Sequence, residues 1–271
     1  MPINDITLAG GMRSNLLQLQ DSARLLARTT QRLATGLKVN TAVDDASAYF
    51  AAQNHRSRAN DLAARKQAMG EAIQTVEAAS GGIDGITSLI EQAKGVAASA
   101  RSASVADRAT LATQFDGLMT QITNLAADAG YKGTNLLAAA STLTVDFNES
   151  GSSDITITGF DASAAGLGVA AAANAWAANG DIDAAVADLD IALSTLRTNA
   201  STLASNNTVI STRQAFTDDL INTLTTGASQ LTAADQNEEG ANMLALQTRQ
   251  QLGIVSLSLS SQAQQGVLSL F

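Results

Sequence analysis

Apolar residues recur at alternating spacings of three and four over long stretches near both ends of this chain. Such spacing is the seam of a coiled-coil heptad, in which a helix buries one narrow stripe against another helix. The two stretches consist of Leu16, Leu19, Ala23, Leu26, Thr30, Leu33 and Leu37, and of Ile182, Val186, Leu189, Leu193, Leu196, Ala200, Leu203 and Ile210. The pattern predicts long helices in both halves of the chain, and the matching heptad character of the end helices indicates that the two termini pack on each other.

Long helices are permitted throughout because the single proline, Pro2, lies at the very start of the chain. We expect a first helix over about 5–35, with Gly36 as its C-cap and a polar loop over 38–45.

Two further helices are expected before the middle of the chain. Asp44 and Asp45 suit the start of a helix that continues to about residue 100, because carboxylates cap and stabilise helix N-termini. Glycines within it, at 81, 82, 85 and 95, either weaken it or allow close packing. A third helix ends at Gly130 and contains Leu111, Phe115, Leu118, Ile122 and Leu125.

In the middle of the chain the apolar period changes to two, which predicts a β-hairpin with a Gly-Ser-Ser turn. The alternating residues are Leu143, Val145, Phe147, Ile155 and Ile157. Residues 160–179 are rich in Ala and Gly without a clear period, so helix and loop are both possible there.

The helical pattern resumes after Asp181 and extends to about residue 231. A polar break at Asp235–Gly240 precedes a last helix that carries no charged side chain after Arg249. The apolar face of this helix, which contains Leu246, Leu252, Val255 and Leu259, needs a partner. Two terminal helices with uncharged tips cannot bury their own outer faces, so the pattern favours an open polymer of many copies.

Composition excludes several classes of function. The chain has 16 Lys+Arg against 25 Asp+Glu, a net charge of -9, which argues against a nucleic-acid partner. It contains no cysteine, and His55 is its single histidine, so the usual metal and nucleophile sites cannot be assembled. We therefore expect no catalytic residue, no metal site and no cofactor. We also expect neither a secretory signal peptide nor a membrane helix.

Three segments resemble bacterial flagellins. The stretch RLATGLKVNTAVDDA, from Arg32 to Ala46, is similar to the N-terminal signature of that family, and DRATLATQFDGLMTQITNLAADAGYKGTNLL, from Asp107 to Leu137, to its next block. The end, QQLGIVSLSLSSQAQQGVLSLF, resembles the flagellin C-terminus. The family positions are matched by Arg32, Gly36, Asn40, Asp44, Asp45, Gly133, Gln250, Gln251, Gly253 and Gln262.

The resemblance implies a mainly α fold, an elongated antiparallel bundle or coiled coil of N- and C-terminal helices with a small β-hairpin in the middle. By the same resemblance, residues 1–43 and 235–271 are inner-core segments, 44–140 and 181–234 form an outer helical domain, and 141–180 is a short variable segment. The near absence of an insertion resembles the short flagellins common in alphaproteobacteria.

A flagellin-like chain is expected to build an extracellular, hollow flagellar filament for swimming from copies of itself. Its expected partners are other flagellin copies, the flagellar type III export machinery, an export chaperone, and the filament cap and junction proteins. The expected inner-core assembly residues are Leu16, Leu19, Leu26, Leu33, Leu252, Val255, Leu259, Val267, Leu268 and Leu270.

Two alternatives stay open at this point, a hook-filament junction protein and an amphipathic-helix protein that binds a surface; the acidic composition argues against the second. One departure concerns a further partner. Strong activators of the vertebrate innate-immune flagellin receptor carry a basic surface at the positions of residues 89–98, where this chain has Glu91 and Gly95. We expect weak or no receptor activation, because an anion reverses the sign of that contact.

Overall fold

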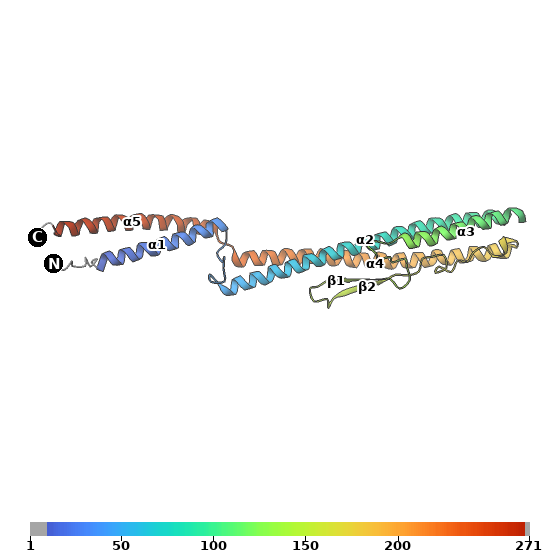
Figure 1. Cartoon of the computed structure of the whole chain (residues 1–271), viewed down its shortest axis with the longest axis horizontal. Coiled ribbons are helices and arrows are strands. Elements are labelled where there is room, and N and C mark those ends of the chain that lie inside the picture. The colour runs from blue at the N-terminus through green and yellow to red at the C-terminus, as the bar shows by residue number, and fades with distance from the viewer. Residues whose placement is uncertain (1–9, 269–271) are drawn as a thin grey trace. The chain divides into compact units, whose positions relative to one another are not determined.

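The computed structural model describes residues 10–268, without the side chains of residues 10, 11, 264 and 266–268. Five long helices and one hairpin account for most of this range (Figure 1). The elements are α1 (Gly10–Thr35), α2 (Ala46–Ser102), α3 (Val105–Asp128), β1 (Thr142–Asp146), β2 (Asp154–Thr158), the 3-10 turn η1 (Ala173–Trp176), α4 (Asn179–Thr232) and α5 (Gln236–Leu268). The expected mainly α fold with a small central hairpin is confirmed.

The chain divides into two compact units. Unit 1 comprises the chain up to Ser57 together with the chain from Leu224 onward, and unit 2 comprises Arg58–Thr223.

In unit 1, α1 and α5 lie side by side and run in opposite directions (Figure 1). The facing side chains are the least exposed ones on each helix, and they recur with heptad spacing. On α1 these are Asn15, Leu19, Ser22, Leu26, Thr29 and Leu33; on α5 they are Glu239, Met243, Leu246, Gln250, Gly253, Leu257 and Ser260. We call these two rows the seam.

The prediction for the contacting row of α1 is correct for one set of heptad positions and wrong for the other. Leu19, Leu26 and Leu33 do lie in it, but Leu16 and its heptad equivalents at 23 and 30 are exposed. Polar residues at 15, 22 and 29 take their places, and Ser22 and Thr29 are buried. A rotation of α1 by about 50°, half a residue position, keeps the three leucines at the contact while turning Leu16 outward.

The two connectors of unit 1 are hydrogen-bonded to each other. Gly36 ends α1 with a φ of 69°, a conformation that glycine adopts without strain. Leu37 forms a β-bridge with Ala233, and the Lys38 N–H donates to the Thr232 carbonyl at 2.7 Å. The predicted polar break over 235–240 is shorter, because the Asp235 carboxylate accepts from the Asn237 N–H at 2.8 Å and starts α5 at once.

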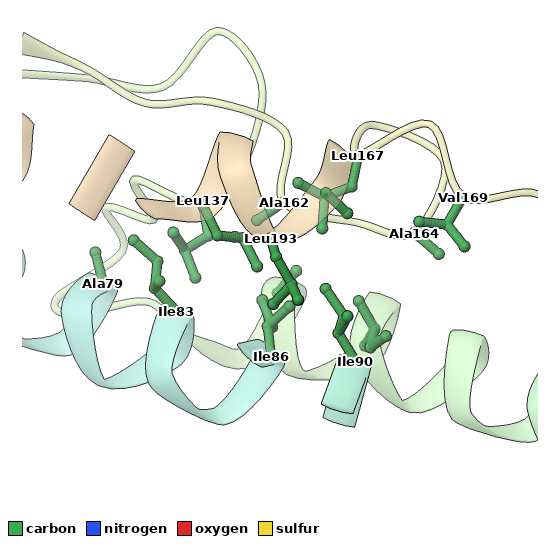
Figure 2. Close-up of a cluster of buried hydrophobic side chains, with 14 of the residues drawn as sticks. Ala79, Ile83, Ile86, Ile90, Leu137, Ala162, Ala164, Leu167, Val169 and Leu193 are labelled. Atoms are coloured by element: carbon green, nitrogen blue, oxygen red, sulfur yellow. The ribbon is translucent and has the colours of Figure 1, made fainter. Parts of the chain in front are cut away.

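Unit 2 has a core formed by α2, α3, α4 and the segment that follows the hairpin. Figure 2 shows Ile83, Ile86 and Ile90 of α2 packed toward Leu193 of α4 and toward Leu137, Ala162, Ala164, Leu167 and Val169. The glycines of α2 do not interrupt the helix. A Cβ at Gly82 would lie 2.6 Å from Leu137 Cδ1, so this glycine allows close packing, which is the second of the two roles expected for the glycines of this helix.

The hairpin forms where the sequence alternates. Val145 of β1 and Ile157 of β2 are buried, while Thr144 and Thr156 face outward and pair through their hydroxyls at 3.2 Å. Residues 160–179, for which helix and loop were both possible, are mostly irregular. They are anchored by the fully buried Trp176, whose ring lies 4.9 Å from that of Phe115.

Candidate assembly surface

Exposed apolar side chains concentrate in unit 1. Among the described residues, eleven of the fifteen large hydrophobic side chains that are exposed belong to it. These are Leu16, Leu17, Leu25, Val43, Phe50, Leu231, Leu244, Leu252, Ile254, Val255 and Leu259. Contiguous exposed apolar surface on a soluble protein marks an interaction site, so unit 1 is where a partner is expected to bind.

One row of these residues follows the outer face of α5. Leu244, Leu252, Val255 and Leu259 are 63%, 64%, 64% and 67% exposed, and we call them the outer stripe. Each residue advances about 100° around the helix axis, so the four side chains lie within roughly 80° of one another around α5. The middle of this arc is roughly opposite the seam. Helix α5 is therefore two-sided, with one row against α1 and a second row open to another molecule.

The predicted assembly residues divide between these two locations. Leu19, Leu26 and Leu33 are partly buried in the seam, whereas Leu16 and the three predicted residues of α5 face outward. Val267 and Leu268 are part of α5, but their side chains lie outside the described residues, as does Leu270 altogether.

Family positions in α1 and the following loop stabilise unit 1. Arg32 forms an ion pair with Glu239 at 2.9 Å, and the two side chains are only 24% and 9% exposed. The Asn40 amide donates to the Thr35 hydroxyl at 3.2 Å, which holds the loop against the end of α1.

The two predicted capping carboxylates have different roles. Asp45 caps α2, because its carboxylate accepts from the Ala48 N–H at 3.0 Å. Asp44 instead holds the preceding loop, accepting from the N–H and the hydroxyl of Thr41, each at 3.0 Å. These hydrogen bonds to Thr41 hold the pKa of the Asp44 carboxyl below its ordinary value.

The remaining family positions lie in the seam, on the surface and in one turn. Gly253 is in the seam, where a Cβ would lie 2.7 Å from Leu19 Cδ2, so the leucine packs over the glycine. Gln250 is also in the seam, whereas Gln251 and Gln262 are exposed. Gly133 has a φ of 84° in the turn after α3.

Sequence reasoning did not identify Glu239 as the partner of Arg32, nor the buried Ser22 and Thr29 of the seam. The signal available for Glu239 was its place in a heptad row with Leu246 and Gly253.

Charge is divided unevenly between the units. The 16 basic residues split 7 to 9 between unit 1 and unit 2, while the 25 acidic residues split 7 to 18. Unit 1 is therefore neutral, and the whole net charge of -9 belongs to unit 2. A net charge of zero favours self-association of this unit, because identical copies then do not repel one another through net charge.

The described residues contain no group of three or more His, Cys, Asp or Glu placed to hold a metal ion. Outside unit 1, pKa shifts occur at two surface ion pairs. Lys132, 2.6 Å from Glu71, lowers the pKa of that carboxyl, and a hydrogen bond from its own backbone together with Arg58 lowers the pKa of the Glu149 carboxyl. The contact with Glu71 raises the pKa of Lys132. Within 10–268, none of the helices combines the length and the apolar character of a membrane span.

Comparisons with known proteins agree along the whole chain. Residues 3–142 match the model of the bacterial flagellin N-terminal helical region, and residues 180–271 match that of the bacterial flagellin C-terminal helical region. Flagellin FljM of Caulobacter vibrioides is 30% identical over 273 residues, which is 100% of each chain. A flagellin of Brucella melitensis is 30% identical over 94% of this chain and 95% of its own length.

The crystal structure of Bacillus cereus flagellin covers 55% of this chain and 88% of its own, with a TM-score of 0.49 and 13% identity, a likeness too slight to bear on the fold. The family matches together cover most of the sequence, and the relatives span its full length. This chain belongs to the bacterial flagellin family, whose members are the structural subunits of the extracellular flagellar filament.

Proposed function

We propose that the α1–α5 pair is the polymerising part of this filament subunit, and that the outer stripe packs against neighbouring copies. The observation that carries this proposal is the row of exposed apolar residues on α5, roughly opposite the seam that already holds α1. Such a face is unfavourable in water and becomes favourable when a second molecule covers it.

In this proposal the outer stripe of one copy packs against a different surface of the next copy. A contact of this kind generates an open helix of subunits when the rotation between successive copies does not close a ring. The seam within one copy is partly polar, with Asn15, Ser22 and Thr29 at alternate positions. Burial of the outer stripe by neighbours then supplies stabilisation that the α1–α5 pair lacks alone.

By this proposal, residues 1–43 and 235–271 form the inner core of the filament, 44–140 and 181–234 an outer helical domain, and 141–180 the exposed variable segment. The subunit acts mechanically and carries out no catalysis. Its further partners are the flagellar export machinery, an export chaperone, and the cap and junction proteins.

Weak activation of the innate-immune flagellin receptor is part of the same proposal. In the segment 89–98, Glu91 is exposed, and the single cation, Lys94, is paired with Asp190 at 2.5 Å. A receptor surface that needs a free cation there meets an exposed anion instead. A strong reporter-cell response to the monomer would contradict this part.

Electron microscopy after seeding tests the role of the terminal pair. The full-length chain is expected to form long tubes, while a chain truncated at Ala241, which removes most of α5, stays monomeric. Tubes from the truncated chain would show that the outer stripe is dispensable, and no tubes from either chain would contradict filament formation itself.

A further inference from the structure

A cationic hollow lies between α1 and α5 in unit 1. It has a volume of about 300 Å³, and both helices line it. Its lining includes Leu25, Arg28 and Arg32 of α1, and Glu239, Asn242 and Arg249 of α5. With three guanidinium groups and one carboxylate, these residues carry a net charge of +2, in a chain whose net charge is -9.

In the described part of the chain, two of the three arginines form no close ion pair, although Arg28 acts on the Asp44 carboxylate through a longer-range charge interaction, secondary to the hydrogen bonds from Thr41. Arg32 is bound to Glu239 at 2.9 Å, so the one carboxylate of the hollow is already taken. Within the described residues, Arg28 and Arg249 form neither an ion pair nor a hydrogen bond, although acidic residues outnumber basic ones 25 to 16. The same helix offers a contrast, because Arg24 is paired with Asp21.

We propose that this hollow binds an Asp or Glu side chain of a second copy of the chain, held between Arg28 and Arg249. A guanidinium group matches a carboxylate in charge and in planar geometry. The Asn242 amide adds a hydrogen-bond donor, and Leu25 adds an apolar contact for the methylene stem of the incoming side chain.

A second copy is the partner that the surroundings favour. Arg249 precedes Leu252 of the outer stripe by three residues, about one helical turn, so a neighbour that covers the stripe also reaches the hollow. This inference rests on the proposed polymerisation and adds an ionic contact to it. Because one such contact recurs in every subunit, it also fixes how neighbours are placed along the filament.

Charge-neutral substitutions test the contact. The variant R28Q/R249Q is compared with R24Q/R197Q, which loses the same two charges at exposed positions outside the hollow. We expect the critical concentration for polymerisation in low salt to rise about tenfold or more in the first variant and to change less than about twofold in the second. Added NaCl should raise the critical concentration of the unmodified chain more than that of R28Q/R249Q, because salt screens the contact.

Zero-length cross-linking tests the partner. In R28K/R249K the positive charges remain, and a carbodiimide joins an introduced lysine to a carboxylate that it touches. Filaments grown from a mixture of unlabelled and ¹⁵N-labelled copies should yield peptides linked between the two labels, whereas the monomer should not.

Cross-links found only within one copy, or the absence of cross-links, would overturn the proposal. Equal critical concentrations for R28Q/R249Q and for its control R24Q/R197Q would overturn it as well. If the unmodified chain fails to form filaments, the proposed function falls together with this inference. Normal filaments from R28Q/R249Q at an unchanged critical concentration refute the cationic contact alone.

Discussion

Replacement of the outer stripe by polar residues of similar length should suppress polymerisation without unfolding the monomer. In L252Q/V255Q/L259Q the three side chains that change are 64%, 64% and 67% exposed. Complete burial of an aliphatic side chain is worth about 2 kcal/mol, so neighbours that cover the exposed two-thirds contribute about 1.3 kcal/mol per residue. The three together amount to about 4 kcal/mol per subunit, or roughly a thousandfold in critical concentration.

The critical concentration is measured by sedimentation after seeding with fragments of unmodified filaments. Circular dichroism of the monomer should be unchanged, because the three side chains make few contacts within their own copy. The control L252M/V255I/L259M keeps the apolar area and should polymerise within about threefold of the unmodified chain, since swaps that conserve apolar character cost little. Normal filaments from the glutamine variant at an unchanged critical concentration would refute the assignment of this face.

Three further predictions concern the stability of the monomer. In urea unfolding, G81A should stabilise the chain by up to about 1 kcal/mol, because the added Cβ meets nothing within 4 Å. The adjacent substitution G82A should destabilise the chain, because its Cβ would lie 2.6 Å from Leu137 Cδ1 and 2.7 Å from Ala129 Cβ. W176A should cost about 3–5 kcal/mol in the same assay, since it empties a fully buried site against Phe115, and a loss below about 1 kcal/mol would contradict the anchoring role. The pKa of the Asp44 carboxyl is lowered in the folded state, so this group stabilises the fold fully above its unfolded pKa of about 3.9. The stabilisation is lost as the pH falls through the folded pKa. The variant D44N should therefore have a lower Tm than the unmodified chain near neutral pH, and the difference in Tm should shrink below about pH 4.

Much of the architecture could be predicted because it depends on local periodicity. Apolar residues at spacings of three and four fall on one face only when the segment is an α-helix. The alternating apolar residues of β1 and β2 fall on one face only in an extended strand. Gly36 and Asp45 end and begin helices for reasons contained in their own side chains and backbone. The ends of α1 and α3 and both boundaries of α2 and α4 therefore agree with the pattern to within a few residues, while the predicted start of the first helix near residue 5 lies outside the described residues.

The candidate surface could be predicted only in part. Leu252, Val255 and Leu259 were recognisable as an apolar face without a partner, but Leu246, assigned to the same face, is buried in the seam. Half of the α1 row that meets α5 was likewise misassigned, by one residue position. An apolar stripe on a helix is wider than the contact it makes, so spacing alone does not select between neighbouring rows such as those of Leu16 and Asn15.

The sequence by itself determined the helices, the hairpin, the acidic balance and the family, because each follows from neighbours in the chain or from short motifs. Only the tertiary structure decided which face of α5 meets α1, that Arg32 takes Glu239 as its partner, and that Arg28 and Arg249 lie around one hollow without a close ion pair among the described residues. The net charge of unit 1 likewise emerged only when both ends of the chain were brought together. These features depend on residues more than 200 positions apart in the chain, and their pairing is set by packing that no local pattern encodes.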